Sequence, residues 1–330
     1  MMFSNLKNKT VLVTGGAGFI GSNLCEALLE LGAKVRCMDN LSTGFISNIQ
    51  SFIEDDNFQF MEADITALEA CQRACHQVDY VLHQAALGSV PRSLKDPITT
   101  NAVNVDGFLN MLVAARDQNV KRFVYAASSS TYGDATKLPK IEDEIGAPLS
   151  PYAITKYVNE LYATIFKTSY DLDTVGLRYF NVFGKKQDPK GAYAAVIPKF
   201  VIQLLNHESP RINGDGSFSR DFTFIDNVIQ MNFLALTTNN SLALNQIYNT
   251  AVGDRTTLVK LVHNLKKYLS KFDPVIANVQ VIHGPERFGD VPHSQASIEK
   301  AIKLLNYKPT HNFESGLKNA VDWYWERFKN

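Results

Sequence analysis

The sequence predicts an α/β fold in which a Rossmann-type, doubly wound parallel sheet is joined to a smaller, interleaved C-terminal α/β domain. Six short runs are almost continuously apolar rather than alternating, as expected of parallel strands buried on both faces. They are Thr10–Thr14, Ala33–Asp39, Phe58–Asp64, Val78–His83, Arg122–Ser128 and Thr174–Phe180. Between them, Ser22–Leu31 and Val105–Asp117 carry apolar residues at helical spacing. Alternation of strand and helix predicts a parallel sheet with right-handed crossovers.

After residue 180 the regular alternation of predicted strands and helices ends. Gly and Pro become frequent, and the helices predicted over Ala194–Asn206 and Thr256–Leu269 lack regular strand partners. The Gly- and Pro-rich segments between these helices are expected to be surface loops that can close over a ligand. Residues Gln246–Ala251 are an exception, because they resemble a strand that returns to the first sheet. We therefore expect domains at residues 1–180 and 181–330, interleaved through a return segment near residues 225–252.

Composition and charge narrow the class of protein. The 330 residues contain 33 Lys and Arg against 33 Asp and Glu, so the formal net charge is zero. A neutral average argues against a nucleic-acid binder or a polybasic membrane-surface protein. No apolar run approaches the roughly 20 residues of a membrane span, and the first residues do not resemble a signal peptide. We therefore expect a cytoplasmic protein with no nucleic-acid or membrane partner.

The four cysteines are Cys25, Cys37, Cys71 and Cys75. Since none follows residue 75, a disulfide framework for the whole chain is excluded and reduced thiols are expected. Cys71 and Cys75 stand one helical turn apart, but no nearby His or Cys set completes the spacing of a zinc site. We expect no metal centre.

A glycine-rich turn joins the first strand to the first helix. Gly15, Gly18 and Gly21 permit a tight turn, close approach of the backbone to a pyrophosphate, and packing of helix on strand, with phosphate at the positive end of the helix. Asp39 ends the second strand, where a carboxylate accepts hydrogen bonds from ribose hydroxyls and repels a 2′-phosphate. The pattern predicts a dinucleotide site that favours NAD over NADP.

Two further strand ends are expected in the same pocket. Asp64 and Ile65 follow the third strand, where the carboxylate would either reach the adenine edge or cap the next helix; the two roles are compatible. Gln84, Ala85 and Ala86 follow the fourth strand, and the small residues among them would let the cofactor lie close.

Residues suited to proton transfer follow the fifth strand. Ser128, Ser129 and Ser130 end that strand, and Tyr152 and Lys156 stand at i and i+4, on one face of a helix. A nearby ammonium and a positive nicotinamide would favour the Tyr152 phenolate and lower its pKa from about 10. A serine hydroxyl would hold a substrate hydroxyl against the tyrosine oxygen.

Several motifs together resemble a known enzyme family. GGAGFIG, SSSTYG, Tyr152-x-x-x-Lys156 and GLRYFNVFG resemble the extended short-chain dehydrogenase/reductase family, in particular nucleotide-sugar 4-epimerases of the UDP-galactose 4-epimerase group. HQAALGSVPRS, LRYFNVFGKKQDPKGAYAAVIPK and RFGDVPHS more closely resemble the branch that acts on N-acetylated sugars, the UDP-N-acetylglucosamine 4-epimerases. The similarity covers residues 10 to 328.

The resemblance implies reversible C4 epimerisation of UDP-N-acetylglucosamine to UDP-N-acetylgalactosamine for surface polysaccharide synthesis, with UDP-glucose and UDP-galactose as a second candidate pair. Hydride would pass from C4 to tightly bound NAD and return to the opposite face. Dehydratases and decarboxylases of the family usually carry an acidic residue after the Ser/Thr, whereas this chain has Ser129-Ser130-Thr131. Two alternatives stay open: another nucleotide-sugar-modifying dehydrogenase (a dehydratase, decarboxylase or reductase), and an inactive NAD-binding protein.

The resemblance also assigns site residues. Catalysis falls to Ser128, Tyr152 and Lys156. The implied cofactor contacts are Gly15, Gly18, Phe19, Ile20, Gly21, Asp39, Asn40, Ser42, Thr43, Gly44, Asp64, Ile65, Gln84, Ala85, Ala86, Tyr152, Lys156, Tyr179 and Val182. The implied substrate contacts are Gly88, Ser89, Ser128, Ser129, Ser130, Asn181, Ala195, Val196, Lys199, Arg220, Arg287 and Ser294. Among these, the two arginines would clamp the diphosphate, since guanidinium groups suit bidentate contacts.

Substrate preference and assembly are implied by the same resemblance. Ser294 stands where relatives restricted to plain sugars carry a bulky Tyr, which implies space beside C2 for an N-acetyl group. Gly88 and Ser89 would line that pocket. The helices Val105–Asp117 and Tyr152–Thr168 would pair with their symmetry mates in a four-helix bundle. The expected partners are thus a UDP-sugar and a second copy of the chain.

Overall fold

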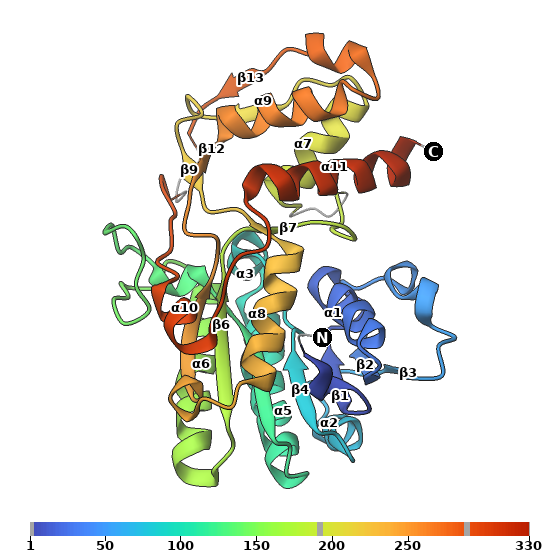
Figure 1. Cartoon of the computed structure of the whole chain (residues 1–330). Helices are drawn as coiled ribbons and strands as arrows, with labels where there is room; N and C mark the ends of the chain where they lie inside the picture. Colours follow the sequence, from blue (N-terminus) through green and yellow to red (C-terminus); the bar gives the residue numbers. More distant parts are fainter. Residues whose placement is uncertain (1–2, 190–193, 287–290, 330) are drawn as a thin grey trace.

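The computed structural model describes residues 3–189, 194–286 and 291–329, and it confirms the predicted fold class (Figure 1). Its centre is a seven-stranded parallel sheet in the order β11-β6-β5-β4-β1-β2-β3. The strands are β1 Thr10–Thr14, β2 Lys34–Asp39, β3 Phe58–Glu62, β4 Tyr80–His83, β5 Arg122–Ser128, β6 Thr174–Tyr179 and β11 Gln246–Thr250. The strand order reverses between β1 and β4, which is where doubly wound sheets bind their ligands.

Helices cover both faces of the sheet. They are α1 Phe19–Glu30 and α8 Ile225–Thr237 on one face, and α2 Leu68–Cys75, α5 Gly107–Asp117 and α6 Pro151–Tyr170 on the other. Neighbouring residues of one strand therefore enter opposite cores: Val11 and Val13 belong to the core beneath α1, and Leu12 to the core beneath α5. This two-sided burial is the reason why the strands are continuously apolar in sequence.

Local signals set the ends of α6, which carries two of the expected catalytic residues. The Ser150 hydroxyl accepts a hydrogen bond from the Ala153 N–H at 3.2 Å, and Pro151 occupies the first turn. The helix ends before Asp171, which has a left-handed φ of 56°. Tyr152 and Lys156 consequently lie within the first two turns.

The helix predicted over Val105–Asp117 is helical throughout, but its α-helical part begins only at Gly107. Ala102–Asp106 forms a π-helical turn (η4), so that α5 begins at Gly107. A Cβ atom at Gly107 would lie 2.7 Å from the Ile65 side chain, and the glycine thus allows close packing there. Two short helices precede this turn, α3 Val90–Lys95 and α4 Pro97–Asn101.

The remaining elements form a cap beyond the ends of the sheet strands, at the top of Figure 1. Its helices are α7 Val196–Leu205, α9 Leu258–Leu269 and α11 Phe313–Lys329, which share one apolar core. Its strands pair in twos: β7 Val182–Phe183 with β10 Thr223–Phe224, β9 Ser219–Arg220 with β12 Thr256–Thr257, and β8 Arg211–Asn213 with β13 Ile282–Gly284. The chain returns to the sheet through α8 and β11, and α10 (Glu299–Leu305) packs against β11.

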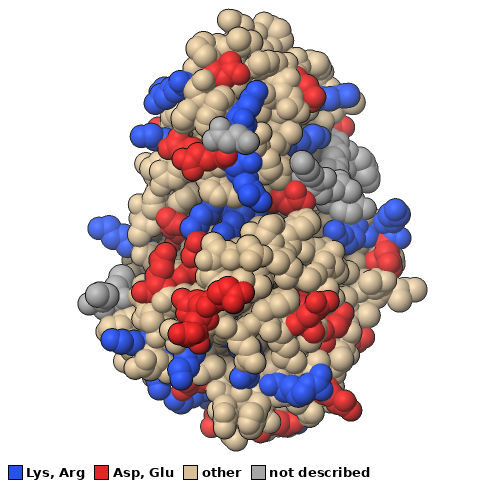
Figure 2. All heavy atoms as spheres, turned by 90° about the vertical axis from the view of Figure 1, so that its right-hand side faces the viewer, with Lys and Arg blue, Asp and Glu red and all other residues tan. Residues whose placement is uncertain are grey.

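Acidic and basic side chains are interspersed on the face shown in Figure 2. Across the described parts of the chain, no helix combines the length and the apolar character needed to cross a membrane. All four cysteines are buried free thiols.

Candidate active site

A cavity of about 660 Å³ lies at the carboxyl ends of the central strands, between the sheet and the cap. This is the expected ligand position in an open α/β sheet. Most of the residues predicted from sequence line it: Gly15, Gly18, Phe19, Ile20, Gly21, Asp39, Asn40, Ser42, Thr43, Ile65, Gln84, Ala85, Ala86, Gly88, Ser128, Tyr152, Lys156, Tyr179, Asn181, Val182 and Ala195.

The glycine turn leaves its backbone open to the cavity. A Cβ atom at Gly15, whose φ is +65°, would lie 2.8 Å from the Ala85 backbone, and one at Gly21 would collide with the Gly15 carbonyl oxygen. At Gly18, by contrast, a Cβ atom would meet only the Gly15 oxygen, at 3.1 Å. Gly18 also precedes α1 without any side-chain cap. The first amide groups of α1 are thus suited to a pyrophosphate.

Asp39 is buried against this turn. Its Oδ2 accepts a hydrogen bond from the Ala17 N–H at 3.0 Å, and its Oδ1 accepts one from the Leu41 N–H at 2.8 Å. Burial raises the pKa of this carboxyl, and the backbone hydrogen bonds partly oppose the rise. Each oxygen keeps a second acceptor position for a ribose hydroxyl. Gly44 does not line the cavity; a Cβ atom there would lie 2.9 Å from Asp39 Oδ2, so this glycine leaves room for the carboxylate.

The prediction that Asp64 caps the helix after the third strand is wrong. The residue before α2 is Ala67, whereas Asp64 Oδ1 accepts hydrogen bonds from the Thr66 N–H at 2.8 Å and the Thr66 hydroxyl at 2.7 Å. The Asp64 carboxylate therefore forms an Asx turn with the residue two positions later and does not cap α2. Asp64 Oδ2 also accepts a hydrogen bond from Asn40 Nδ2 at 2.6 Å. Asp64 thus orients Asn40, which lines the cavity, and is not itself a lining residue.

Ser128, Tyr152 and Lys156 converge on the cavity from β5 and α6. Lys156 Nζ donates to the Ala126 carbonyl oxygen at 2.8 Å. Burial lowers the Lys156 pKa to about 8, although the Glu160 carboxylate acts in the opposite direction. Ser128 Oγ accepts hydrogen bonds from the Ser130 N–H at 3.2 Å and the Ser130 hydroxyl at 2.9 Å. Its own hydrogen can then point toward Tyr152 or a ligand.

The electrostatics of Tyr152 differ from expectation. Burial raises the pKa of its phenol, and a hydrogen bond with Ser128 only partly offsets this. The Lys156 ammonium, which donates to the Ala126 carbonyl oxygen, is not among the groups that shift this pKa. A positive nicotinamide ring beside the phenol would therefore have to supply most of the lowering.

Ser129 and Ser130 form the 3-10 turn after β5 and do not line the cavity. Ser89 instead caps α3, where its hydroxyl accepts a hydrogen bond from the Arg92 N–H at 3.2 Å. Its neighbour Gly88 does line the cavity, and a Cβ atom there would meet nothing within 4 Å. Arg92, which was not predicted, is a further lining residue.

A second cavity of about 410 Å³ adjoins the first within the cap. The two share Asn181, Val182, Ala194 and Ala195 as a common wall. The predicted residues Val196, Lys199 and Arg220 line the second cavity. So do residues that the sequence did not reveal, including Arg211, Asn213, Phe218 and Phe222. The adjoining cavities suit an elongated ligand that runs from the sheet into the cap.

Asp221 holds this part of the site together, and sequence reasoning missed it. The side chain is fully buried, and it accepts hydrogen bonds from the N–H groups of Val252 and Gly253 at 3.1 Å and of Ala296 at 3.3 Å. Its carbonyl oxygen accepts a hydrogen bond from Asn181 Nδ2 at 3.1 Å. Burial raises the Asp221 pKa to about 7. The only signal in the sequence is its position directly after Arg220.

Ser294, a predicted substrate residue, lines neither cavity. The Ser294 N–H donates to the Ser219 carbonyl oxygen at 3.0 Å, so the serine lies beside the strand that carries Arg220 but is not a lining residue. Arg287 lies outside the described residues.

Two polar residues that were not predicted support the site: Gln187 lines the cavity, and Asn232 contacts the lining residue Tyr179. Gln187 Nε2 donates to the Val182 carbonyl oxygen at 3.1 Å, while its buried Oε1 has no hydrogen-bond partner among the described residues. Tyr179 is fixed by a small network, in which its hydroxyl donates to Gln84 Oε1 at 2.9 Å and accepts from Asn232 Nδ2 at 2.9 Å. Neither Gln187 nor Asn232 directly follows a strand of the central sheet, so neither carries the sequence signal of a strand end.

The fold and the cavity define a dinucleotide-dependent enzyme that has a tyrosine and a lysine at its proton-transfer site. The model of the NAD dependent epimerase/dehydratase family matches residues 11–251, and the chain belongs to that family. Its cofactor is NAD. The open backbone of the glycine turn and the Asp39 carboxylate suit the pyrophosphate and a ribose of this cofactor.

Relatives of similar length support this membership. A putative UDP-glucose 4-epimerase of Methanocaldococcus jannaschii is 35% identical over 95% of this chain and 97% of its own length. A solved UDP-N-acetylglucosamine 4-epimerase from Methanobrevibacter ruminantium M1, in complex with UDP-N-acetylmuramic acid, is 37% identical with a TM-score of 0.91, and the match covers 98% of this chain and 100% of that one. A UDP-glucose 4-epimerase from Thermotoga maritima, solved with UDP-glucose, is 35% identical with a TM-score of 0.88 over 96% and 99% of the two chains.

Proposed function

We propose that the protein is a UDP-sugar 4-epimerase that interconverts UDP-N-acetylglucosamine and UDP-N-acetylgalactosamine, and also UDP-glucose and UDP-galactose, for surface polysaccharide synthesis. The observation that carries the proposal is the convergence of Ser128, Tyr152 and Lys156 on a cavity that adjoins a second one lined by Arg220. The first cavity suits the cofactor and the sugar, and the second suits the diphosphate and the base.

In the proposed mechanism, Tyr152 accepts the proton of the sugar 4-hydroxyl and later returns it. The Ser128 hydroxyl donates to the reacting oxygen, because its own acceptor positions are used by Ser130. NAD, when bound, would supply the acceptor for the hydride of C4 and the donor that gives a hydride back to the opposite face of the sugar. Arg220 holds the diphosphate while the sugar turns about that link.

The preference for an N-acetylated sugar is the finer part of the proposal. Gly88 supports it, since the space beside this residue is open within the cavity. The resemblance of residue 294 to the position where relatives restricted to plain sugars carry a bulky Tyr supports the same preference, and its segment lies against the strand of Arg220. The similar structure of an enzyme named for UDP-N-acetylglucosamine supports the same choice.

We also propose a homodimer that pairs through α5 and α6. Ile154, Leu161 and Ile165 lie on one face of α6 and are 52%, 50% and 54% exposed, and Ile98 on the adjacent α4 is 82% exposed. Exposed apolar side chains of this kind on neighbouring helices suit a partner surface. Light scattering of the purified protein would test this, with Leu161→Glu expected to give monomers.

Two further expectations complete the proposal. The four buried free thiols support a reducing, cytoplasmic compartment. The domain limits are residues 1–180, with a return segment near 225–252, and residues 181–330.

The reaction is tested by incubating the purified protein with UDP-N-acetylglucosamine or UDP-glucose without added NAD. Chromatographic separation of the 4-epimers should show product from both sugars, since the retained cofactor is regenerated in each cycle. A keto product or the absence of any epimer would contradict the proposal.

A further inference from the structure

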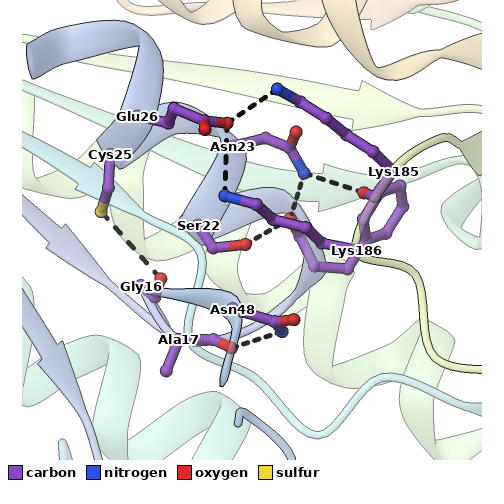
Figure 3. A network of polar contacts seen from close by, with 10 residues as sticks. Gly16, Ala17, Ser22, Asn23, Cys25, Glu26, Asn48, Lys185 and Lys186 are labelled. Atoms are coloured by element: carbon purple, nitrogen blue, oxygen red, sulfur yellow. Dashed lines mark hydrogen bonds and ion pairs between the residues drawn. The ribbon is translucent and has the colours of Figure 1, made fainter. Parts of the chain in front are cut away.

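Outside the cavity, a cluster of polar side chains joins α1 to the loop that follows β7 (Figure 3). Glu26 Oε2 lies 2.7 Å from Lys185 Nζ and 3.2 Å from Lys186 Nζ. Asn23, one turn earlier on α1, donates from Nδ2 to the carbonyl oxygens of Lys185 at 3.0 Å and Phe19 at 2.8 Å. We call Asn23, Glu26, Lys185 and Lys186 the latch.

Lys186 is held more firmly than a surface lysine. Its side chain is only 11% exposed, and its Nζ lies 4.9 Å from the centre of the Phe52 ring. It also has a left-handed φ of 67°, a conformation that is unfavourable for residues other than glycine. Lys186 therefore contacts α1 and the short helix η3 (Gln50–Phe52) in addition to its own loop.

The latch stays charged near neutral pH. Burial alone would raise the pKa of Glu26, but the two lysines outweigh it and hold the pKa below its ordinary value. A carboxylate shared by two ammonium groups thus bridges two segments that are far apart in the sequence.

These two segments carry neighbouring parts of the wall of the cofactor cavity. Phe19 and Ile20 line it from the first turn of α1, and Gln187 and Asp188, directly after Lys186, line it from the loop. The latch residues themselves do not line the cavity. Separation of the loop from α1 would open the cavity along one side, and the latch opposes that movement from outside.

We propose that the latch retains NAD in the enzyme by holding the loop of residues 185–188 against the helix that receives the pyrophosphate. Its members are positioning residues, since they touch neither the substrate nor the reacting atoms. The inference rests on the NAD dependence of the family and is independent of which sugar is epimerised.

The test is the rate at which bound NAD is released. Holoenzyme loaded with radiolabelled NAD is mixed with excess unlabelled NAD, and the label that remains on the protein is followed by rapid gel filtration at low and high salt. Glu26→Gln should release NAD about two- to tenfold faster, in keeping with the modest strength of a partly exposed ion-pair network. High salt should accelerate release from the unmodified enzyme more than from Glu26→Gln, because only the former has the ion pairs of Glu26 with Lys185 and Lys186 to screen.

Two variants separate this role from a merely structural one. Glu30→Gln changes an exposed carboxylate on the same helix, which has no ion pair with a described residue, and should release NAD at the unmodified rate. The double variant Glu26→Lys, Lys185→Glu again places opposite charges at positions 26 and 185 and should restore the retention of NAD. Glu26→Lys alone should release NAD fastest. If Glu26→Gln releases NAD at the unmodified rate, or if its release remains equally salt-sensitive, the latch does not retain the cofactor. Since the readout is NAD release, this outcome would leave the proposed epimerase activity untouched.

Discussion

The cofactor side and the cap side of the cleft are built differently. On the cofactor side, the lining residues follow the ends of adjacent parallel strands, so sequence-local motifs converge by the geometry of the sheet itself. On the cap side, paired strands of two or three residues carry Arg220 and Arg211, and their positions depend on contacts such as those of Asp221 with Val252 and Ala296. The first region is therefore fixed by regular secondary structure, and the second by a few buried long-range hydrogen bonds.

The largest effect is expected at the boundary between the two regions. Tyr152→Phe removes the proton acceptor and should lower kcat by about 10²–10⁴-fold, the usual contribution of a general base. Unchanged circular dichroism and NAD content would show that the fold is intact. Tyr157→Phe, on the same helix but outside the cavity lining, is the matched control and should retain activity. Near-normal turnover in Tyr152→Phe would refute its assignment as the base.

The dependence of the cap side on Asp221 predicts a pH effect on stability. Its pKa is about 7 in the folded protein and near 3.9 when unfolded, so its stabilising contribution is complete below about pH 4 and is lost as the pH rises through 7. The integrated loss is at most about 4 kcal/mol, at 1.36 kcal/mol per pKa unit.

Urea unfolding between pH 4 and pH 8 tests this effect. Asp221→Asn lacks the titration, so its stability relative to the native protein should increase up to about pH 7 and then level off. Asp56→Asn changes an exposed carboxyl that is not among the groups shifting the Asp221 pKa, and it should follow the native pH dependence. A difference between Asp221→Asn and the native protein that does not vary with pH would contradict the assignment.

On the cofactor side, Asp39→Ala should weaken NAD binding by about 10–100-fold, because charged hydrogen bonds contribute about 1.5–3 kcal/mol. The substitution also removes the acceptor for the Ala17 N–H. NAD content after purification and affinity by calorimetry measure the effect, with the exposed Asp56→Ala as control. Unchanged retention would exclude a role for Asp39 in cofactor binding.

The smallest effect is expected for the selectivity of the cap side. Ser294→Tyr should reduce kcat/KM for UDP-N-acetylglucosamine about tenfold relative to UDP-glucose, a typical size for steric discrimination. The two sugars are compared with the same enzyme preparation. Equal losses of kcat/KM for both sugars would mean that residue 294 does not determine the selectivity for the N-acetyl group.

Most of the cofactor side could be predicted from the sequence, since a strand, a glycine turn and a Tyr-Lys pair are local signals. The error at Asp64 has a local cause: a threonine two residues later offered the carboxylate a competing turn. Asp221 and Gln187 give no such local signal. Asp221 matters because it accepts hydrogen bonds from segments that are distant in the chain. Gln187 lines the cavity because its loop packs there. The pKa of Tyr152 likewise depends on burial, to which residue spacing is blind.

The wall formed by Asn181, Val182, Ala194 and Ala195 has a consequence for redesign. Because both cavities share these residues, a substitution there that reshapes the sugar nucleotide site also reshapes the cofactor site, and the two properties cannot be varied separately. Lys199, Arg211 and Phe218 line only the second cavity. Libraries that aim to change the accepted sugar nucleotide while keeping the cofactor bound should therefore begin with these three positions.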